Sequence, residues 1–264
     1  MANSPSGESV IHRVVRILAA FKDENPSLSL RQLARLADLP VSTVHRLVGE
    51  LEIEGLLVRD DQKMLRHGHR LWEIASRGSR ASSLREAALP HMEDLVNQTG
   101  SHVSLGVIEG TDVLYLERLA VDDSTVNITK IAGRLPVHGC SAGLIYMAFA
   151  PDSERELFLS RRLEKLTPDT VVEPAELRAL LAKARERGFI SMGGIIVPES
   201  SGISVPIFGA EGQVLAMLTL ILGRGDENLP SNLPQLTFAS RAISRRLGYE
   251  PDARGIRRRS APLV

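Results

Sequence analysis

Apolar residues between positions 28 and 59 recur three and four apart in two short runs, which predicts two helices joined by a tight turn. The first run ends before Asp38–Val41, where Pro40 disfavours helical geometry at the residue before it. Ser42 is a suitable N-cap for the second helix. That helix would bury Val44, Leu47, Val48 and Leu51 and leave polar residues facing outward. A helix, a turn and a helix with a polar N-terminal face is the layout of a helix-turn-helix, whose second helix fits the DNA major groove.

A predicted β-hairpin follows the second helix. Gly55 ends the helix, 56–59 is expected to be a strand, 60–63 a turn and 64–66 the return strand. An ordinary helical hairpin in a core would also explain the two helices, but a hairpin directly after them favours a winged helix-turn-helix. Lys63 and Arg66 on this wing are expected to lie near DNA phosphates.

Flanking segments complete a predicted DNA-binding domain over residues 10–68. Residues 1–9 are small and polar, which predicts a disordered N-terminus ending at Ser9, a cap for a helix from Val10 to about Lys22. The broad apolar face of that helix fits a third core helix, and pairing with its copy in a dimer is a second possible role. Residues 69–81 are expected to form a linker helix. Its Trp72 fits either an anchor between domains or subunits, or ordinary core packing.

Beyond residue 82 the pattern mixes period-two strands with helices, which predicts an α+β domain over 82–248 with a mainly antiparallel sheet. The expected strands are 102–108, 113–119, 125–131, 202–208 and 214–222. The expected helices are 141–149, 152–160, 174–187 and 233–247, preceded by one that Ser82 or Ser83 opens and that runs to about Thr99. Residues 249–264 form a basic tail that is expected to be disordered. Contact with phosphates is one possible role, but such tails are more often simply solvated.

Charge and composition limit the function classes. The chain has 32 basic and 32 acidic residues, and residues 1–68 contain nine of each. The net charge therefore gives no indication of nucleic-acid binding. We therefore expect modest non-specific affinity and a specific complex that depends on dimerisation and shape. The sequence contains no signal-peptide core and no apolar run of membrane-span length, so we expect a cytoplasmic protein without membrane contact.

Candidate catalytic groups are few. The single cysteine, Cys140, excludes an intramolecular disulfide and a multi-cysteine zinc site. His138 is its only tempting partner, but residues at i and i+2 need not converge, and no third orienting group is evident. We expect no enzyme activity, no catalytic residues, no metal and no cofactor.

Three blocks of the sequence resemble the IclR family of bacterial regulators. They are the winged-helix block LRQLARLADLPVSTVHRLVGELEIEGLLVRD, the block GRLPVHGCSAGLIYMAFAP at 133–151, and the block RERGFISMGGIIVPESSGISVPIFGAEGQVLAMLTL. With their spacing they cover roughly residues 10–248. The resemblance implies an N-terminal winged helix, a linker helix and a C-terminal GAF-like effector-binding domain. It also implies a homodimer, or a dimer of dimers, that binds palindromic double-stranded operator DNA and responds to a small organic effector, often a carboxylic or aromatic metabolite.

Two sets of residues are the candidates for binding. For DNA, hydroxyls and backbone N–H groups at a helix N-terminus can hold phosphate, and arginine can contact guanine bidentately; the candidates are Ser42, Thr43, His45, Arg46, Arg31, Gln32, Lys63 and Arg66. For the effector, the resemblance implies Leu135, Ser141, Ala142, Met192, Gly202 and Thr219, with Asn127 on a preceding strand. The N-terminus of the helix at Ser141 suits a carboxylate, although Ser141 is equally well explained as an N-cap. Arg134 and His138 could add charge or a hydrogen bond, and His138 is more simply a structural residue.

The sequence departs from the family after Gly188-Phe189, where many members have an acidic cluster and then a cysteine. Here Met192–Ile196 and Gly202-Ile203 stand instead, and Leu144 occupies a position that is often lysine. These differences argue against a metal in the pocket and favour a more apolar or differently shaped effector. The alternative function is a constitutive, architectural DNA-binding protein whose second domain only oligomerises.

Overall fold

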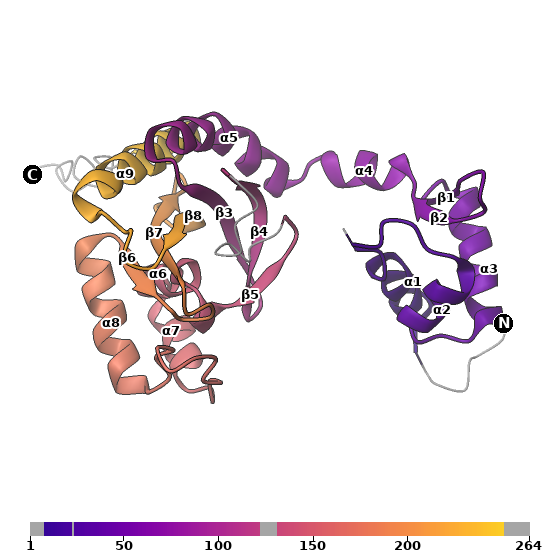
Figure 1. The fold of residues 1–264 in the computed structure, drawn as a ribbon, viewed down its shortest axis with the longest axis horizontal. Coiled ribbons are helices and arrows are strands. Elements are labelled where there is room, and N and C mark those ends of the chain that lie inside the picture. Colours follow the sequence, from indigo (N-terminus) through magenta and orange to yellow (C-terminus); the bar gives the residue numbers. More distant parts are fainter. Residues whose placement is uncertain (1–7, 23, 122–130, 251–264) are drawn as a thin grey trace, which may run out of the picture. The chain divides into compact units, whose positions relative to one another are not determined.

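The computed structural model describes residues 8–22, 24–121 and 131–250, and the chain divides into two compact units, Met1–Ser79 and Arg80–Val264 (Figure 1). The expected strand at 125–131 and candidate residue Asn127 fall largely or wholly outside the described residues. None of the described helices is long and apolar enough to cross a lipid bilayer.

The first unit is a winged helix-turn-helix. Helices α1 (Val10–Ala19), α2 (Leu30–Leu36) and α3 (Val41–Ile53) precede the antiparallel strands β1 (Leu57–Arg59) and β2 (Leu65–His67). The apolar positions predicted to face inward, including Leu33, Val44 and Leu47, form one buried cluster with Leu57 and Leu65 of the wing. Backbone hydrogen bonds between Leu28 and Leu65, at 3.0 and 2.8 Å, attach the segment before α2 to the wing. The predicted winged helix is therefore confirmed.

Helix ends in this unit follow local chemistry. Ser9 caps α1 by accepting a hydrogen bond from His12 N at 3.1 Å, and Ser29 and Gln32 form a capping box at α2. Gly55 adopts a positive φ of 69° directly after α3. Helix α4 (His69–Ser76) closes the unit, and its Trp72 is 72% exposed. Core packing within the unit is therefore the wrong explanation for Trp72.

The second unit has a helix–sheet–helix arrangement. In the described residues, a six-stranded sheet has the order β5-β4-β3-β8-β7-β6, and every neighbouring pair is antiparallel. The strands are β3 (His102–Glu109), β4 (Asp112–Leu119), β5 (Arg134–Pro136), β6 (Ile190–Gly193), β7 (Ser200–Phe208) and β8 (Val214–Gly223). The predicted antiparallel α+β class is confirmed, although the short strands β5 and β6 were not predicted.

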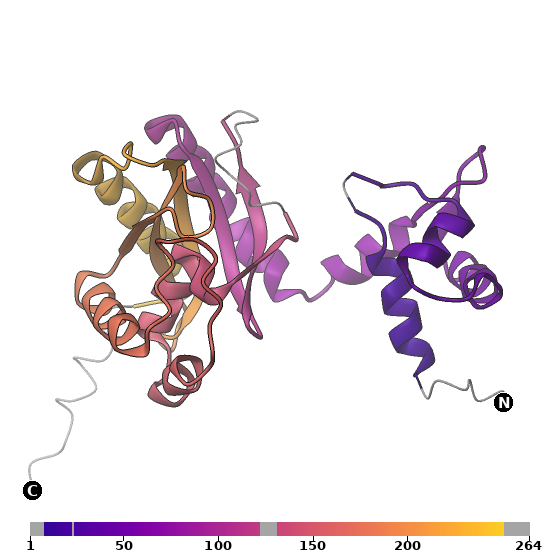
Figure 2. The ribbon, with the colours of Figure 1, turned by 60° about the horizontal axis from the view of Figure 1, so that its bottom comes forward.

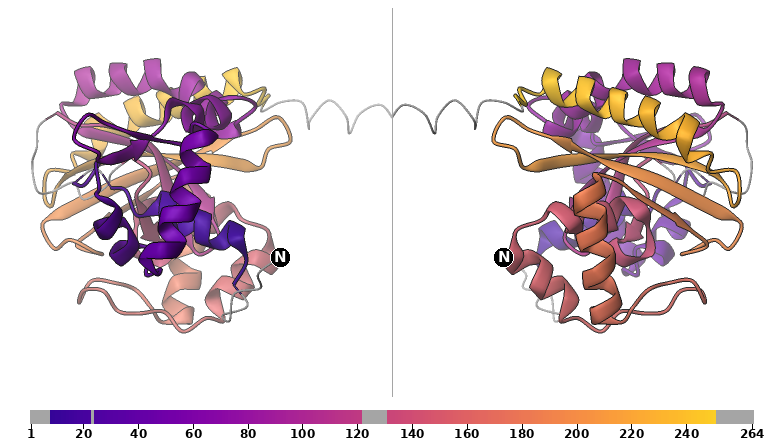
Figure 3. Two further views of the ribbon diagram at one scale, coloured as in Figure 1. Left: turned by 90° about the vertical axis from the view of Figure 1, so that its right-hand side faces the viewer. Right: turned by 90° about the vertical axis from the view of Figure 1, so that its left-hand side faces the viewer.

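Helices cover both faces of this sheet (Figures 2 and 3). Helices α5 (Arg80–Thr99) and α9 (Leu229–Arg246) lie side by side on one face of the sheet. They bury one apolar cluster with the residues of β3, β7 and β8 that face them. Helices α6 (Ser141–Phe149), α7 (Asp152–Leu159) and α8 (Pro174–Arg187), with the 3-10 turn η1 (Val137–Gly139), bury a second cluster on the opposite face. The sheet thus separates two cores, and the predicted bounds of α6 and α8 agree with the structure.

Two helix starts in the second unit differ from the prediction. Helix α5 begins at Arg80 rather than Ser82, and α9 begins at Leu229 rather than Leu233. Both helices contain an internal proline, Pro90 and Pro234. Pro230 lies in the first turn of α9 and favours the observed start at Leu229, because proline fits the first turn of a helix.

Candidate functional site

The N-terminus of α3 presents uncapped backbone N–H groups. The structure corrects the expected N-cap: the helix begins at Val41, Pro40 is the N-cap residue, and no side chain caps the end. The first intrahelical bond at this end runs from Val44 N to Pro40 O at 3.0 Å. Ser42 therefore lies in the first turn with an exposed hydroxyl. This end can bind an anion through backbone N–H groups.

The polar side chains of α3 form one solvent-facing row. His45 and Arg46 are exposed, and Thr43 is half-buried. The guanidinium of Arg46 forms an ion pair with Glu50 at 2.5 Å, one helical turn later on the same face. This row is the predicted DNA-contacting surface, but Arg46 would have to leave Glu50 before it could contact a guanine base.

The remaining DNA candidates have mixed surroundings. Arg31 is exposed at the start of α2, whereas the amide oxygen of Gln32 accepts hydrogen bonds from Ser29 N and Oγ at 2.9 and 2.7 Å. On the wing, Lys63 has a positive φ of 60°, and Arg66 pairs with Asp60 at 3.1 Å. The Asp60 carboxylate therefore offsets part of the positive charge of the wing.

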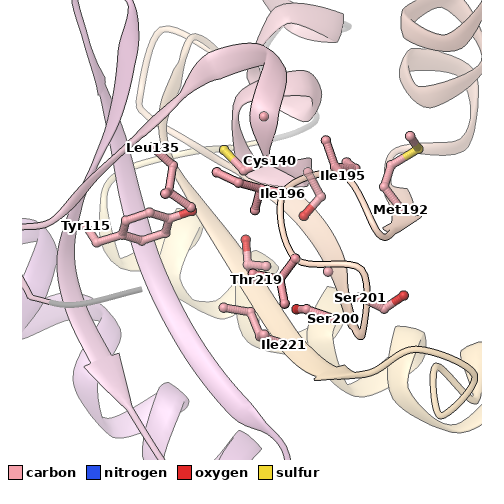
Figure 4. A pocket seen from close by; sticks show the side chains of 14 residues that line it. Tyr115, Leu135, Cys140, Met192, Ile195, Ile196, Ser200, Ser201, Thr219 and Ile221 are labelled. Atoms are coloured by element: carbon pink, nitrogen blue, oxygen red, sulfur yellow. The ribbon is translucent and has the colours of Figure 1, made fainter. Parts of the chain in front are cut away.

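A pocket in the second unit lies between the N-terminus of α6 and the face of the sheet that α6 covers (Figure 4). It offers about 60 Å³ to the centre of a water molecule, and about 440 Å³ of atom-free space when its open mouth is included. The smaller figure, which leaves out open solvent, lies below the range of about 300–1,000 Å³ that is common for small-molecule sites. The lining residues are Tyr115, Leu135, Gly139, Cys140, Ser141, Met192, Ile195, Ile196, Val197, Ser200, Ser201, Gly202, Thr219 and Ile221.

A chain of hydroxyl groups runs beneath the pocket. Ser204 Oγ donates to Ser141 Oγ at 2.8 Å and is hydrogen-bonded to Thr219 Oγ1 at 2.7 Å. All three residues are buried, and they connect α6 with strands β7 and β8. Gly202 leaves room for this arrangement, since a Cβ at that position would lie 2.4 Å from Ser141 Oγ. Ser141 thus begins a helix, but its hydroxyl bonds across to the sheet rather than capping its own helix.

A loop after β6 forms the apolar wall of the pocket, and hydrogen bonds from residues outside the pocket hold this loop in place. Ile195, Ile196 and Val197 supply this wall. Thr167 Oγ1 donates to the carbonyl oxygens of Gly194 and Ile195 at 2.6 and 3.1 Å, and Thr170 Oγ1 donates to that of Ile195 at 2.7 Å. These bonds fix the loop over the pocket.

Cys140 and His138 do not form a catalytic pair. Burial raises the pKa of the Cys140 thiol to about 11, despite hydrogen bonds from Gly143 N–H and Tyr115, so the nucleophilic thiolate is scarce at neutral pH. Burial likewise raises the pKa of Tyr115 well above its usual value. His138 Nε2 lies 2.9 Å from Glu164 O and lines a neighbouring groove, so it is a structural histidine. Within the described ranges, no group of three or more His, Cys, Asp or Glu side chains could hold a metal ion.

The pocket brings together most, but not all, of the effector candidates. Leu135, Ser141, Met192, Gly202 and Thr219 line it, whereas Ala142 is buried beside it without lining it. Sequence reasoning missed Tyr115, the loop residues 195–197 and Ile221. The alternation along β4 was a usable signal for Tyr115, because it places Val113 and Tyr115 on the same inward face.

A winged helix-turn-helix joined to an α/β unit with an internal pocket defines the class of two-domain transcriptional regulators. Residues 10–61 match the IclR helix-turn-helix domain, and residues 79–245 match the bacterial transcriptional regulator IclR C-terminal domain. The chain belongs to the IclR family of transcriptional regulators.

Similar proteins match along nearly their whole length. A crystal structure of an IclR homologue from Microbacterium hydrocarbonoxydans, complexed with 4-hydroxybenzoate, is 40% identical with a TM-score of 0.84, over 90% of this chain and 99% of that one. The regulator XynR of Escherichia coli K12 is 27% identical over 90% of this chain and 97% of its own length. The Pca regulon regulatory protein of Pseudomonas putida is 26% identical over 92% and 85%.

Proposed function

We propose that this protein binds operator DNA as a dimer or a dimer of dimers, with an affinity that a small aromatic carboxylic acid modulates. The observation that carries this proposal is the pocket at α6, which combines an apolar wall with hydroxyl groups. Leu135, Met192 and Ile196 can pack against a ring, while Tyr115, Ser141 and Thr219 can bond to its polar substituents. A homologue that is 40% identical was crystallised with 4-hydroxybenzoate, which is a ligand of this chemistry.

The DNA candidates support a role for α3 in the major groove. Its uncapped N-terminus suits a phosphate, and Arg46 suits a guanine edge once it leaves Glu50. A single winged helix covers only one half-site, so a second copy is needed for a palindrome. The exposed apolar residues Val10, Ile11 and Val15 on α1, and Trp72 and Ile74 on α4, support assembly with another chain.

The proposed regulation is a coupling between effector and operator. Effector binding would favour one arrangement of the two recognition helices in the dimer over another, and so change their fit to half-sites that are one DNA turn, or a multiple of it, apart. The size of the effect is limited by the difference in effector affinity between the two arrangements.

Thermal unfolding of the full chain with a panel of aromatic and aliphatic carboxylates tests the sensor function. A ligand that prefers the folded state at 100 times its Kd stabilises by about 2.7 kcal/mol. We expect benzoates to raise the Tm and to change the Kd for a selected operator duplex, measured by fluorescence anisotropy. A panel that shifts neither quantity would favour the architectural DNA-binding protein, whose second unit only oligomerises.

A further inference from the structure

Strand β4 contains a β-bulge that changes which way two charged residues face. Gly106 on β3 pairs with Tyr115, but Leu105 pairs with Glu117, so Leu116 is an extra residue in β4. After the bulge, Glu117 lies on the face covered by α5, where it is buried and forms an ion pair with Arg85 of that helix. Arg118 consequently lies on the opposite face, which is the face that carries the pocket. A bulge beside a binding site commonly redirects a side chain in this way.

The register places Arg118 at the end of a polar row across four strands. Arg118 pairs with Ser104 on β3, Ser104 pairs with Thr219 on β8, and Thr219 pairs with Ser204 on β7. Directly paired residues in antiparallel strands point to the same face. Thr219 lines the pocket, and Tyr115 and Ile221, which also line it, are near neighbours of Ser104 on that face. Ser104 and Arg118 are not lining residues, but they lie on the same face of the sheet as the pocket, in the two strands beyond Thr219.

These two residues have buried polar atoms without partners. Ser104 is 0% exposed, and neither its Oγ nor the Nε of Arg118 has a hydrogen-bond partner. Both groups can donate a hydrogen bond. Buried donors without an acceptor destabilise a folded protein, so two of them side by side require an explanation. A carboxylate, with two acceptor oxygens and a negative charge, would satisfy both.

Other arginines near the pocket are already paired. Arg134 bonds to Glu109, and Arg224 bonds to Asp169 at 2.6 Å. In the part of the chain that the structure describes, Arg118 forms no ion pair, and none of the described pocket-lining residues is charged. Arg118 is thus a cation on the pocket-bearing face of the sheet whose charge no described carboxylate balances.

We propose that Arg118 and Ser104 recognise the carboxylate of the effector, while the hydroxyl chain at Ser141 receives its opposite end. This rests on the proposed function, because it assigns an orientation to an aromatic acid in the same pocket. The charge-assisted bond from Arg118 makes the site select acids over neutral molecules of the same shape.

Isothermal titration calorimetry tests the assignment by measuring the Kd of the full-length protein for 4-hydroxybenzoate and for 4-hydroxybenzamide. The amide keeps the shape of the acid and loses its charge. We expect the wild type to bind the acid more tightly. Arg118→Gln should lower the affinity for the acid by roughly tenfold to hundredfold and leave the affinity for the amide almost unchanged. The reason is that hydrogen bonds to charged groups are the stronger ones. Ser104→Ala should lower the affinity for the acid without lowering the Tm of the ligand-free protein, because it removes a buried hydroxyl that has no partner.

Arg134→Gln is the matched control, because it removes a guanidinium beside the same sheet that is already paired with Glu109. It should leave the preference for the acid intact. Equal weakening of acid and amide by Arg118→Gln, or no weakening of either, would overturn the assignment while leaving an aromatic effector in place. Absence of binding of both compounds to the wild type would overturn the proposed effector class and the assignment together.

Discussion

Gly202→Ala is a small change that should block the pocket. A Cβ on Gly202 would lie 2.4 Å from Ser141 Oγ and 3.4 Å from Ser141 Cβ. Both atoms are part of the Ser141 side chain, which is buried at the start of α6. The backbone of Gly202 has no positive φ, so alanine introduces no backbone strain. The Ser141 side chain must therefore rotate, which breaks its bond from Ser204.

The magnitude follows from two opposing effects. Overpacking of a buried site costs about 1–3 kcal/mol, and replacing glycine by alanine at a compatible backbone position returns about 0.4–1 kcal/mol. We expect a net destabilisation of about 1–2 kcal/mol. For a domain of 150–250 residues, each kcal/mol lowers the Tm by about 2–4 °C, so the second unit should melt about 2–8 °C lower.

Differential scanning calorimetry and ligand titration of the same samples provide the assay. Gly202→Ala should also reduce the affinity for a benzoate at least tenfold, because the new methyl group fills space beside the Ser141 hydroxyl. Ser141→Ala is the matched control, since it removes that hydroxyl without adding volume and so separates lost bonding from lost space. A Gly202→Ala protein with wild-type Tm and wild-type ligand affinity would refute both the packing argument and the position of the site.

Further predictions concern DNA binding and pH. Arg46→Ala should cost about 1–3 kcal/mol of specific operator binding, and an unchanged gel shift would show that α3 does not dock as proposed. Glu50→Gln should strengthen binding about twofold to fivefold, because it releases Arg46 from a surface pair worth at most about 1 kcal/mol; weaker binding would mean that the pair positions Arg46. Burial raises the pKa of Cys140 from 9.0 to about 11, so its contribution to stability is complete below pH 9 and is lost as the pH rises through 11. Urea unfolding should show that the free energy of unfolding falls less between pH 8 and pH 10.5 for Cys140→Ser than for the wild type. An equal fall in both proteins would contradict this.

Local patterns in the sequence predicted the elements that local forces determine. Helices α6 and α8 have clear signals at their ends, such as Gly188, which follows α8 in the left-handed conformation. The winged helix was predictable for the same reason, since its apolar spacing and turn residues lie within one short stretch. Where a local signal was misleading, as with Ser42, the preceding proline proved to be the helix boundary.

The pocket depends on long-range contacts that no local pattern contains. Ser204 meets Ser141 only because β7 passes beneath α6, and Thr167 reaches Gly194 across 27 residues. The bulge at Leu116 was equally invisible, because simple alternation would have placed Glu117 beside Tyr115 and turned Arg118 away. The resemblance to the family located five pocket residues, but it could not supply the register of β4.

The hydroxyl chain of Thr219, Ser204 and Ser141 gives the pocket an adaptable polarity. In one direction Thr219 donates to Ser204 and Ser204 donates to Ser141, so the hydrogen of Ser141 points to the ligand. Hydroxyl hydrogens rotate to suit their partners. Rotation of all three reverses the chain and presents a lone pair instead, without moving a heavy atom. Effectors of equal size that offer either a donor or an acceptor at this end can therefore both be accommodated, so the chain accepts related metabolites at one end of the pocket.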